Sequence, residues 1–85
     1  MARTPGPWEA RRVPGMKGTA IARVGYMDAC CWVDDRADGS HEGNARLIAA
    51  APDLLAACHQ ALELFEDDEG IAQVLMAAIA KAEGV

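Results

Sequence analysis

The clearest pattern along the chain is a helical spacing of apolar residues in its second half. Over residues 47–65 apolar side chains recur at intervals of three and four, which places them on one side of a helix. The members of this stripe are Leu47, Ala51, Leu54, Cys58, Ala61 and Phe65. A second run with this spacing covers residues 71–82 and is followed by Gly84, a residue typical of helix ends. The sequence therefore predicts a helical part over residues 41–83, with Ser40 as the N-cap of its first helix.

Pro52 interrupts the first apolar stripe. Proline has no backbone N–H and its ring clashes with the preceding helical turn, so a helix must kink or restart there. We favour a restart with Pro52 at the first position of a new helix. The alternative is one kinked helix from Glu42 to Glu66. Beyond it, Asp67 or Asp68 can cap the last helix, because a carboxylate near a helix N-terminus is favourable.

The first half of the chain alternates short apolar runs with turn residues. Residues 1–7 are an extended lead-in, because their prolines forbid a helix. The predicted strands are Trp8–Val13, Thr19–Met27 and Ala29–Val33, with turns at Pro14-Gly15 and at Asp28. Such a small meander is not stable alone and must pack against other elements. We expect Trp8 and Trp32 to pack between sheet and helix.

Together these patterns predict an α+β fold. A three-stranded antiparallel β-meander over residues 8–33 is followed by two or three α-helices packed on it. A chain of 85 residues is expected to form a single domain, residues 1–85.

Charge divides the chain unequally. The net charge is −5, but residues 1–36 sum to +2 and residues 37–85 to −7. The acidic candidates for binding a partner are Glu63, Glu66, Asp67, Asp68 and Glu69, and the basic candidates are Arg11, Arg12 and Arg23. Carboxylates of this kind can dock in a partner's basic groove. Direct nucleic-acid binding is not expected, because it depends on clustered Lys and Arg.

The residues that could carry chemistry lack the required spacing. Structural zinc sites use paired ligands such as C-x₂-C, whereas Cys30 and Cys31 are adjacent and point to opposite faces of a strand. Cys58 and His59 are neighbours and do not face each other on a helix. The acidic run at 66–69 lacks the alternating ligands of a calcium loop. We therefore expect no enzyme, metal or cofactor, and we interpret the three cysteines as small buried hydrophobes.

The sequence predicts a cytoplasmic protein. No apolar run approaches the roughly 18 residues of a membrane-spanning helix. Residues 1–14 contain Arg and Pro and no apolar core of a signal peptide. Three cysteines, an odd number, do not form a disulfide framework and fit a reducing compartment.

Two stretches carry a resemblance to known proteins. Thr4-Pro5-Gly6-Pro7-Trp8 and the stretch from Asn44 to Ala57, which reads NARLIAAAPDLLAA, resemble a group of small phage and prophage proteins in which both motifs recur in this order. Residues 9–43, between the motifs, are too variable to match. Phage proteins of this size and charge include inhibitors of host defence, notably anti-CRISPR proteins, and this is what the resemblance implies.

We therefore expect a phage-derived protein that inhibits a defence machine of the bacterial host cell, of the anti-CRISPR type, by steric protein–protein blockade. Its partner would be a host protein or a ribonucleoprotein such as a CRISPR-Cas interference complex. One alternative is a self-associating structural or accessory phage protein without a host target, for example a homodimer. Another is a weak nucleic-acid accessory protein.

Overall fold

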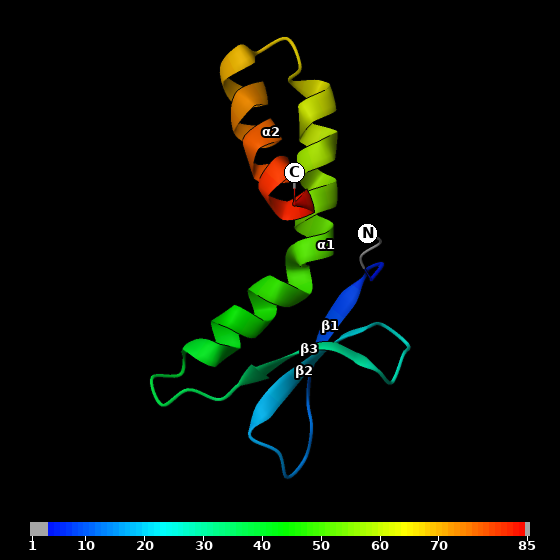
Figure 1. The fold of residues 1–85 in the computed structure, drawn as a ribbon, viewed down its shortest axis with the longest axis vertical. Coiled ribbons are helices and arrows are strands. Elements are labelled where there is room, and N and C mark those ends of the chain that lie inside the picture. Colours follow the sequence, from blue (N-terminus) through cyan, green and yellow to red (C-terminus); the bar gives the residue numbers. More distant parts are fainter. Residues whose placement is uncertain (1–3, 85) are drawn as a thin grey trace. The chain divides into compact units, whose positions relative to one another are not determined.

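The computed structural model describes residues 4–84, and its strands precede its helices along the chain (Figure 1). The elements are β1 (Trp8–Arg12), β2 (Gly18–Arg23), β3 (Ala29–Asp34), α1 (Ser40–Leu64) and α2 (Glu69–Glu83). The predicted α+β class and the three-stranded antiparallel meander are confirmed. Residues 1–3 of the predicted lead-in lie outside the described residues.

The chain divides into two compact units at Pro52. The sheet unit comprises the residues up to Pro52, and thus the three strands and the first half of α1. The helical unit comprises the residues from Asp53 onward, and thus the second half of α1 and all of α2. The single domain expected over residues 1–85 stays a prediction.

The sheet unit is organised around its central strand. β2 pairs antiparallel with β1 on one side and with β3 on the other. Residues 18–22 of β2 are all buried, and Ile21 is 0% exposed. Its cross-strand partners are Ala10 and Cys31. Because neighbouring strands flank β2 on both sides, this short apolar segment forms the core of the sheet unit.

The second strand is shorter than predicted. β2 ends at Arg23 rather than at Met27, and the following turn forms where the Tyr26 N–H donates to the Arg23 carbonyl oxygen over 3.0 Å. Gly25 has a φ of +86°, a value that glycine adopts without steric cost. The reversal therefore occurs at Gly25, and the turn predicted at Asp28 was placed too late in the chain.

The first helix passes through Pro52 without interruption. α1 is one helix of 25 residues with Pro52 inside it, so the favoured restart at Pro52 is wrong and the single-helix alternative has the right connectivity. Strong helix formers flank the proline, namely Ala49 to Ala51 before it and Leu54 to Ala57 after it. They keep the helical backbone through a position that lacks one N–H donor.

The start of α1 also differs from the prediction. Ser40 is the first helical residue, and its N–H donates to Asp38 Oδ1 over 2.9 Å. The capping carboxylate is thus that of Asp38. This hydrogen bond from the Ser40 backbone lowers the pKa of Asp38 below its ordinary value.

In the helical unit, the second half of α1 and α2 run antiparallel (Figure 1). Ala72 and Ile79 of α2 are buried, and His59 Nε2 lies 3.4 Å from Glu83 Oε1. Asp68 is the N-cap of α2, and Gly84 ends the helix with a φ of +78°. Both of these predicted helix boundaries are confirmed.

Candidate interaction surfaces

The five acidic candidates gather around the turn between the two helices. Glu63 lies in the last turn of α1, Glu69 begins α2, and the other three occupy the connection between the helices. All five are exposed. We call Glu63, Glu66, Asp67, Asp68 and Glu69 the acidic tip.

One member of the acidic tip has a structural role. Asp68 Oδ1 accepts the Ile71 N–H over 3.1 Å, and the Asp68 carbonyl oxygen accepts the Ala72 N–H over 2.8 Å. Asp68 therefore satisfies free N–H groups at the start of α2. Among residues 4–84, the carboxylates of the other four tip residues have no ion-pair partner, so they are available to a basic partner.

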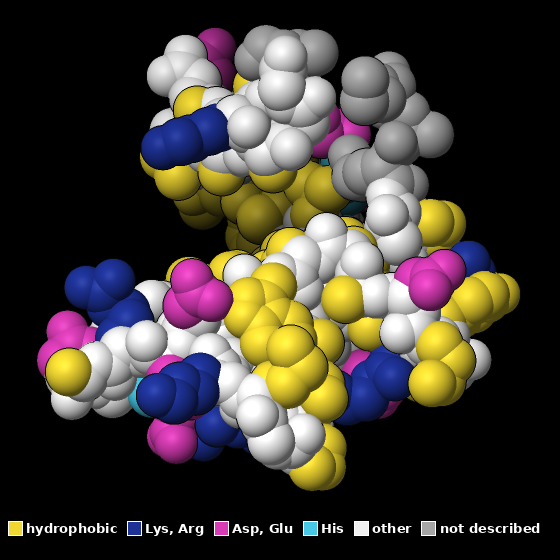
Figure 2. Space-filling view, turned by 60° about the horizontal axis from the view of Figure 1, so that its bottom comes forward, with side chains coloured by type: hydrophobic (Ala, Val, Ile, Leu, Met, Phe, Trp, Pro, Cys, Tyr) yellow, Lys and Arg dark blue, Asp and Glu magenta, His cyan; other side chains and the backbone are white. Residues whose placement is uncertain are grey.

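Apolar side chains accompany the acidic tip. Leu64 is 79% exposed, Phe65 is 47% exposed and Ile71 is 40% exposed. On the face shown in Figure 2, which is turned toward the strands, exposed hydrophobic side chains also lie beside charged ones. Mixed surfaces with an aromatic side chain are typical of protein–protein interfaces.

Arg12 is bound within the sheet unit. Its guanidinium Nη1 lies 2.6 Å from Asp35 Oδ1, and its Nη2 donates to Asp35 Oδ2 over 3.2 Å. This hydrogen-bonded pair raises the pKa of Arg12 and lowers the pKa of Asp35. His41 Nε2 also lies 3.7 Å from Asp35 Oδ1, which brings the start of α1 to the end of β3. Arg12 thus connects β1 to the segment between β3 and α1.

Arg11 and Arg23 are also held by neighbours. Arg11 Nε lies 2.8 Å from Glu9 Oε1, and Arg11 Nη2 donates to the Tyr26 carbonyl oxygen over 2.5 Å. The Arg23 guanidinium lies 4.2 Å from the centre of the Tyr26 ring. Because successive side chains of a strand point to opposite faces, Arg11 and Arg12 lie on different faces of the sheet. The structure therefore does not unite the three basic candidates in one patch.

Trp32 and the cysteines differ from expectation. Trp32 is 39% exposed and its indole lies over Gly18, where a Cβ atom would collide with the ring. Cys30 is exposed rather than buried, and its Sγ donates to the Ile21 carbonyl oxygen over 3.1 Å. Cys31 and Cys58 are half-buried, and burial raises the pKa of the Cys31 thiol. Sequence reasoning missed the Trp32 position because the absent side chain of Gly18 makes room for the indole.

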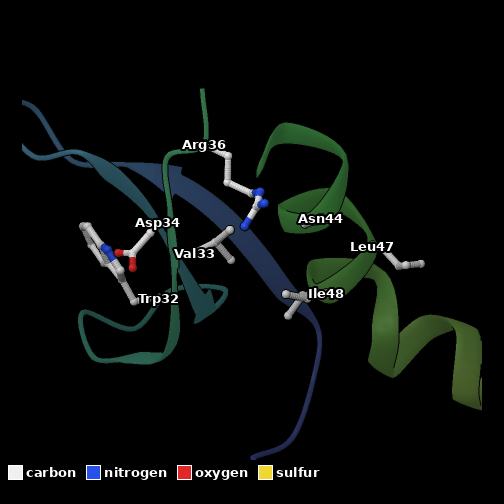
Figure 3. A pocket seen from close by; sticks show the side chains of 7 residues that line it. All are labelled: Trp32, Val33, Asp34, Arg36, Asn44, Leu47 and Ile48. Carbon is white, nitrogen blue, oxygen red and sulfur yellow. The ribbon is translucent and has the colours of Figure 1, made fainter. Parts of the chain in front are cut away.

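A hollow of about 420 Å³ lies between the end of β3 and the first half of α1. Figure 3 shows Val33, Arg36 and Ile48 pointing into the space between the strand and the helix, whereas Trp32 and Asp34 lie on the other side of β3. The hollow combines one guanidinium with apolar walls. Sequence spacing gave no signal for it, because it depends on how α1 lies on the sheet.

Within residues 4–84, His, Cys, Asp and Glu side chains nowhere gather in threes as a bound metal ion would require. Neither described helix is long and apolar enough to cross a membrane.

The fold defines a small α+β protein with exposed acidic and apolar side chains at the end of a helical hairpin. The family model of Salmonella phage P22 protein Y8K6 matches residues 1–85, so the chain belongs to this family of phage proteins. The predicted relation to small phage proteins is thereby confirmed. No curated protein and no solved structure matches the chain.

Proposed function

We propose that this phage protein binds a host protein or ribonucleoprotein complex and blocks it sterically, as an anti-CRISPR protein blocks an interference complex. The acidic tip carries this proposal. Five exposed carboxylates lie within residues 63–69, and four of them have no side-chain hydrogen bond or ion pair within residues 4–84. Machines that handle nucleic acids present Lys and Arg grooves to phosphates, and an acidic tip can occupy such a groove.

The apolar neighbours of the tip supply the second part of a binding surface. Phe65 and Leu64 are exposed between acidic residues, where a partner surface would remove them from water. Long-range attraction between the tip and a basic groove speeds encounter, and burial of the aromatic ring lowers the dissociation rate. The tip would thus combine electrostatic steering with an apolar anchor.

The charge of the helical unit disfavours the nucleic-acid alternative. The residues from Asp53 onward include seven acidic residues and one basic residue, a net charge of −6. The basic side chains Arg11, Arg12 and Arg23 are engaged within the sheet unit and do not form a shared stripe. A phosphate backbone would meet repulsion at the tip and a dispersed set of cations elsewhere. No chemical reaction is proposed for this chain, and no cofactor.

The proposal is tested by capture of the partner. We expect the tagged protein to recover a CRISPR effector or another defence complex in stoichiometric amount from lysates of a bacterium with active defence systems, with identification by mass spectrometry. Expression of the protein should also restore phage plating on that bacterium. Recovery of the bait alone, without any effect on plating, would contradict the proposal.

Charge reversal of the tip gives the sharper test. The variant Glu66→Lys/Asp67→Lys leaves the Asp68 cap intact and should weaken partner binding by at least about 10-fold, since rim and core charges of interfaces contribute from a few tenths to several kcal/mol. The matched control is Glu42→Lys/Asp53→Lys, which reverses two exposed carboxylates outside the tip. Equal binding by both variants and the natural chain would rule out the tip as the contact.

A further inference from the structure

The two outer strands of the sheet have different chemistry. β1 carries charge at three of its five residues, and Pro7 and Pro14 lie close to its two ends. Charged residues and proline discourage edge-to-edge pairing of sheets. β3 has the sequence ACCWVD, without proline and with its only charge at its last residue, Asp34. Only the β1 edge is therefore protected against pairing with another strand.

The hydrogen-bond alternation shows which groups of β3 point outward. The Asp35 N–H donates to the Lys17 carbonyl oxygen over 3.3 Å, next to the ladder in which Val33 is the partner of Thr19. In an antiparallel pair, residues alternate between bonding to the partner strand and pointing away from it. Trp32 and Asp34 therefore present their backbone N–H and C=O groups to the free edge.

The side chains at this edge are accessible. Trp32 is 39% exposed, and Cys30 and Asp34 are also exposed. A free edge with an exposed indole is a surface on which another strand gains both backbone hydrogen bonds and side-chain contacts.

We propose that β3 pairs antiparallel with β3 of a second copy of this chain, about a two-fold axis at Trp32. The outward N–H and C=O of Trp32 then bond to the same groups of the second copy. The two Trp32 residues become cross-strand neighbours. The two sheets join into one sheet of six strands, and each copy's unprotected edge is closed.

Charges at the ends of this seam are complementary. Asp28 and Arg36 lie four residues before and four residues after Trp32. Arg36 follows β3 and Asp28 precedes it, so a two-fold axis at Trp32 brings the end of each strand that carries Arg36 toward the end of the other that carries Asp28. Within residues 4–84, the Arg36 side chain forms one ion pair, with Asp38 at 3.7 Å, between two exposed side chains. Arg36 and Asp28 are separated from Trp32 by the same number of residues, one on each side. This symmetry of opposite charges favours a second copy of the chain over an unrelated extended peptide as the partner of β3.

The seam lies in the sheet unit and the acidic tip lies in the helical unit. Loss of self-association and loss of partner capture can therefore be measured separately, and failure of one proposal leaves the other standing.

Sedimentation equilibrium tests the seam directly. We expect the mass of the natural chain to rise from 9.0 kDa toward twice that value as the concentration increases to about 200 µM. A mass of one chain at every concentration would overturn the proposal.

A charge swap tests the register. Arg36→Asp and Asp28→Arg each place like charges at both ends of the seam, and each should raise the dimer dissociation constant by about 3- to 10-fold. The double variant restores opposite charges and should return the constant to within about 2-fold of the natural value. Additive weakening in the double variant would overturn the Trp32-centred register.

A backbone substitution tests the strand pairing itself. Asp34→Pro removes an outward N–H, whereas the matched Asp34→Ala removes only the carboxylate. We expect the proline variant to raise the dissociation constant at least 10-fold and the alanine variant to change it less than 3-fold, with unchanged circular dichroism of the monomers. In the natural chain, hydrogen exchange at the Trp32 amide should slow as concentration rises. Exchange independent of concentration would contradict the pairing.

Discussion

The two units of the molecule use their charged residues for different purposes. The residues up to Pro52 include seven basic and six acidic residues, and contacts such as those of Arg12 with Asp35 and of Arg11 with the Tyr26 carbonyl oxygen connect strands and loops. The residues from Asp53 onward carry −6, and most of that charge lies at the acidic tip. Several charged residues of the sheet unit therefore form contacts between its segments, whereas most of the charge in the helical unit is exposed at the acidic tip.

The largest effect that separates the two units is expected at Ile21. This side chain is 0% exposed at the centre of β2. Ile21→Ala should lower the free energy of unfolding by about 2–5 kcal/mol, because it removes buried methyl groups and leaves a cavity. Tryptophan fluorescence during urea denaturation measures the effect, since Trp8 and Trp32 both lie in the sheet unit.

Two variants control this experiment. Ile21→Val removes one methyl group and should cost about 0.5–1.5 kcal/mol, which keeps the measurement possible if the alanine variant does not fold. Ile79→Ala alters a buried residue of α2, so it should mainly change the unfolding transition that circular dichroism at 222 nm follows. An Ile21→Ala transition that coincides with that of the natural chain would contradict the role of β2 as the core.

Much of the fold followed from local patterns. The period of the apolar residues predicted both helical regions, and Gly84 and Asp68 marked the ends of α2 because capping is a property of a few neighbouring residues. The helix that continues through Pro52 was only the alternative prediction. Local rules assign proline to a helix start, but they do not weigh the helix-forming residues on both sides of it.

The two sequence motifs illustrate what local reasoning omits. Gly6 of the first motif lies against Pro52 of the second, so closely that a Cβ atom at Gly6 would collide with the proline ring. Trp8 Nε1 donates to the Pro5 carbonyl oxygen over 3.2 Å, which holds the chain just before β1. The spacing of either motif alone contains no information on this contact, because it forms between residues 46 positions apart.

The candidate surfaces were predictable in part. Composition alone identified the acidic tip, because a run of charged residues between two amphipathic helices must be exposed. The partners of Arg11, Arg12 and Arg23 depend on strand register, which the sequence left open. The free edge of β3 required the strand order, and strand order is not a local property.

A smaller effect is expected at the cap of α2. Asp68→Ala removes the oxygen that accepts the Ile71 N–H and should lower the free energy of unfolding by about 1 kcal/mol. Asp67→Ala makes the same change at the neighbouring position, which does not cap the helix, and should leave the stability nearly unchanged. Thermal unfolding followed at 222 nm distinguishes the two. Equal losses would indicate that net charge, rather than the cap, controls the stability of the helical unit.

The smallest effect concerns the pH dependence of the Arg12–Asp35 pair. The hydrogen bond from Arg12 lowers the pKa of Asp35, and His41 and Lys17 also lower it by their charges. A carboxyl whose pKa is lower in the folded state stabilises the fold above its ordinary pKa of about 4, and this contribution disappears as the pH falls through the lowered value. Asp35→Asn should therefore lower the urea midpoint at pH 7 and have little effect near pH 2. The control Asp67→Asn removes the same charge from the acidic tip and should not lower the midpoint at pH 7. A deficit of Asp35→Asn that persists unchanged at pH 2 would show that the pair contributes through packing rather than through ionisation.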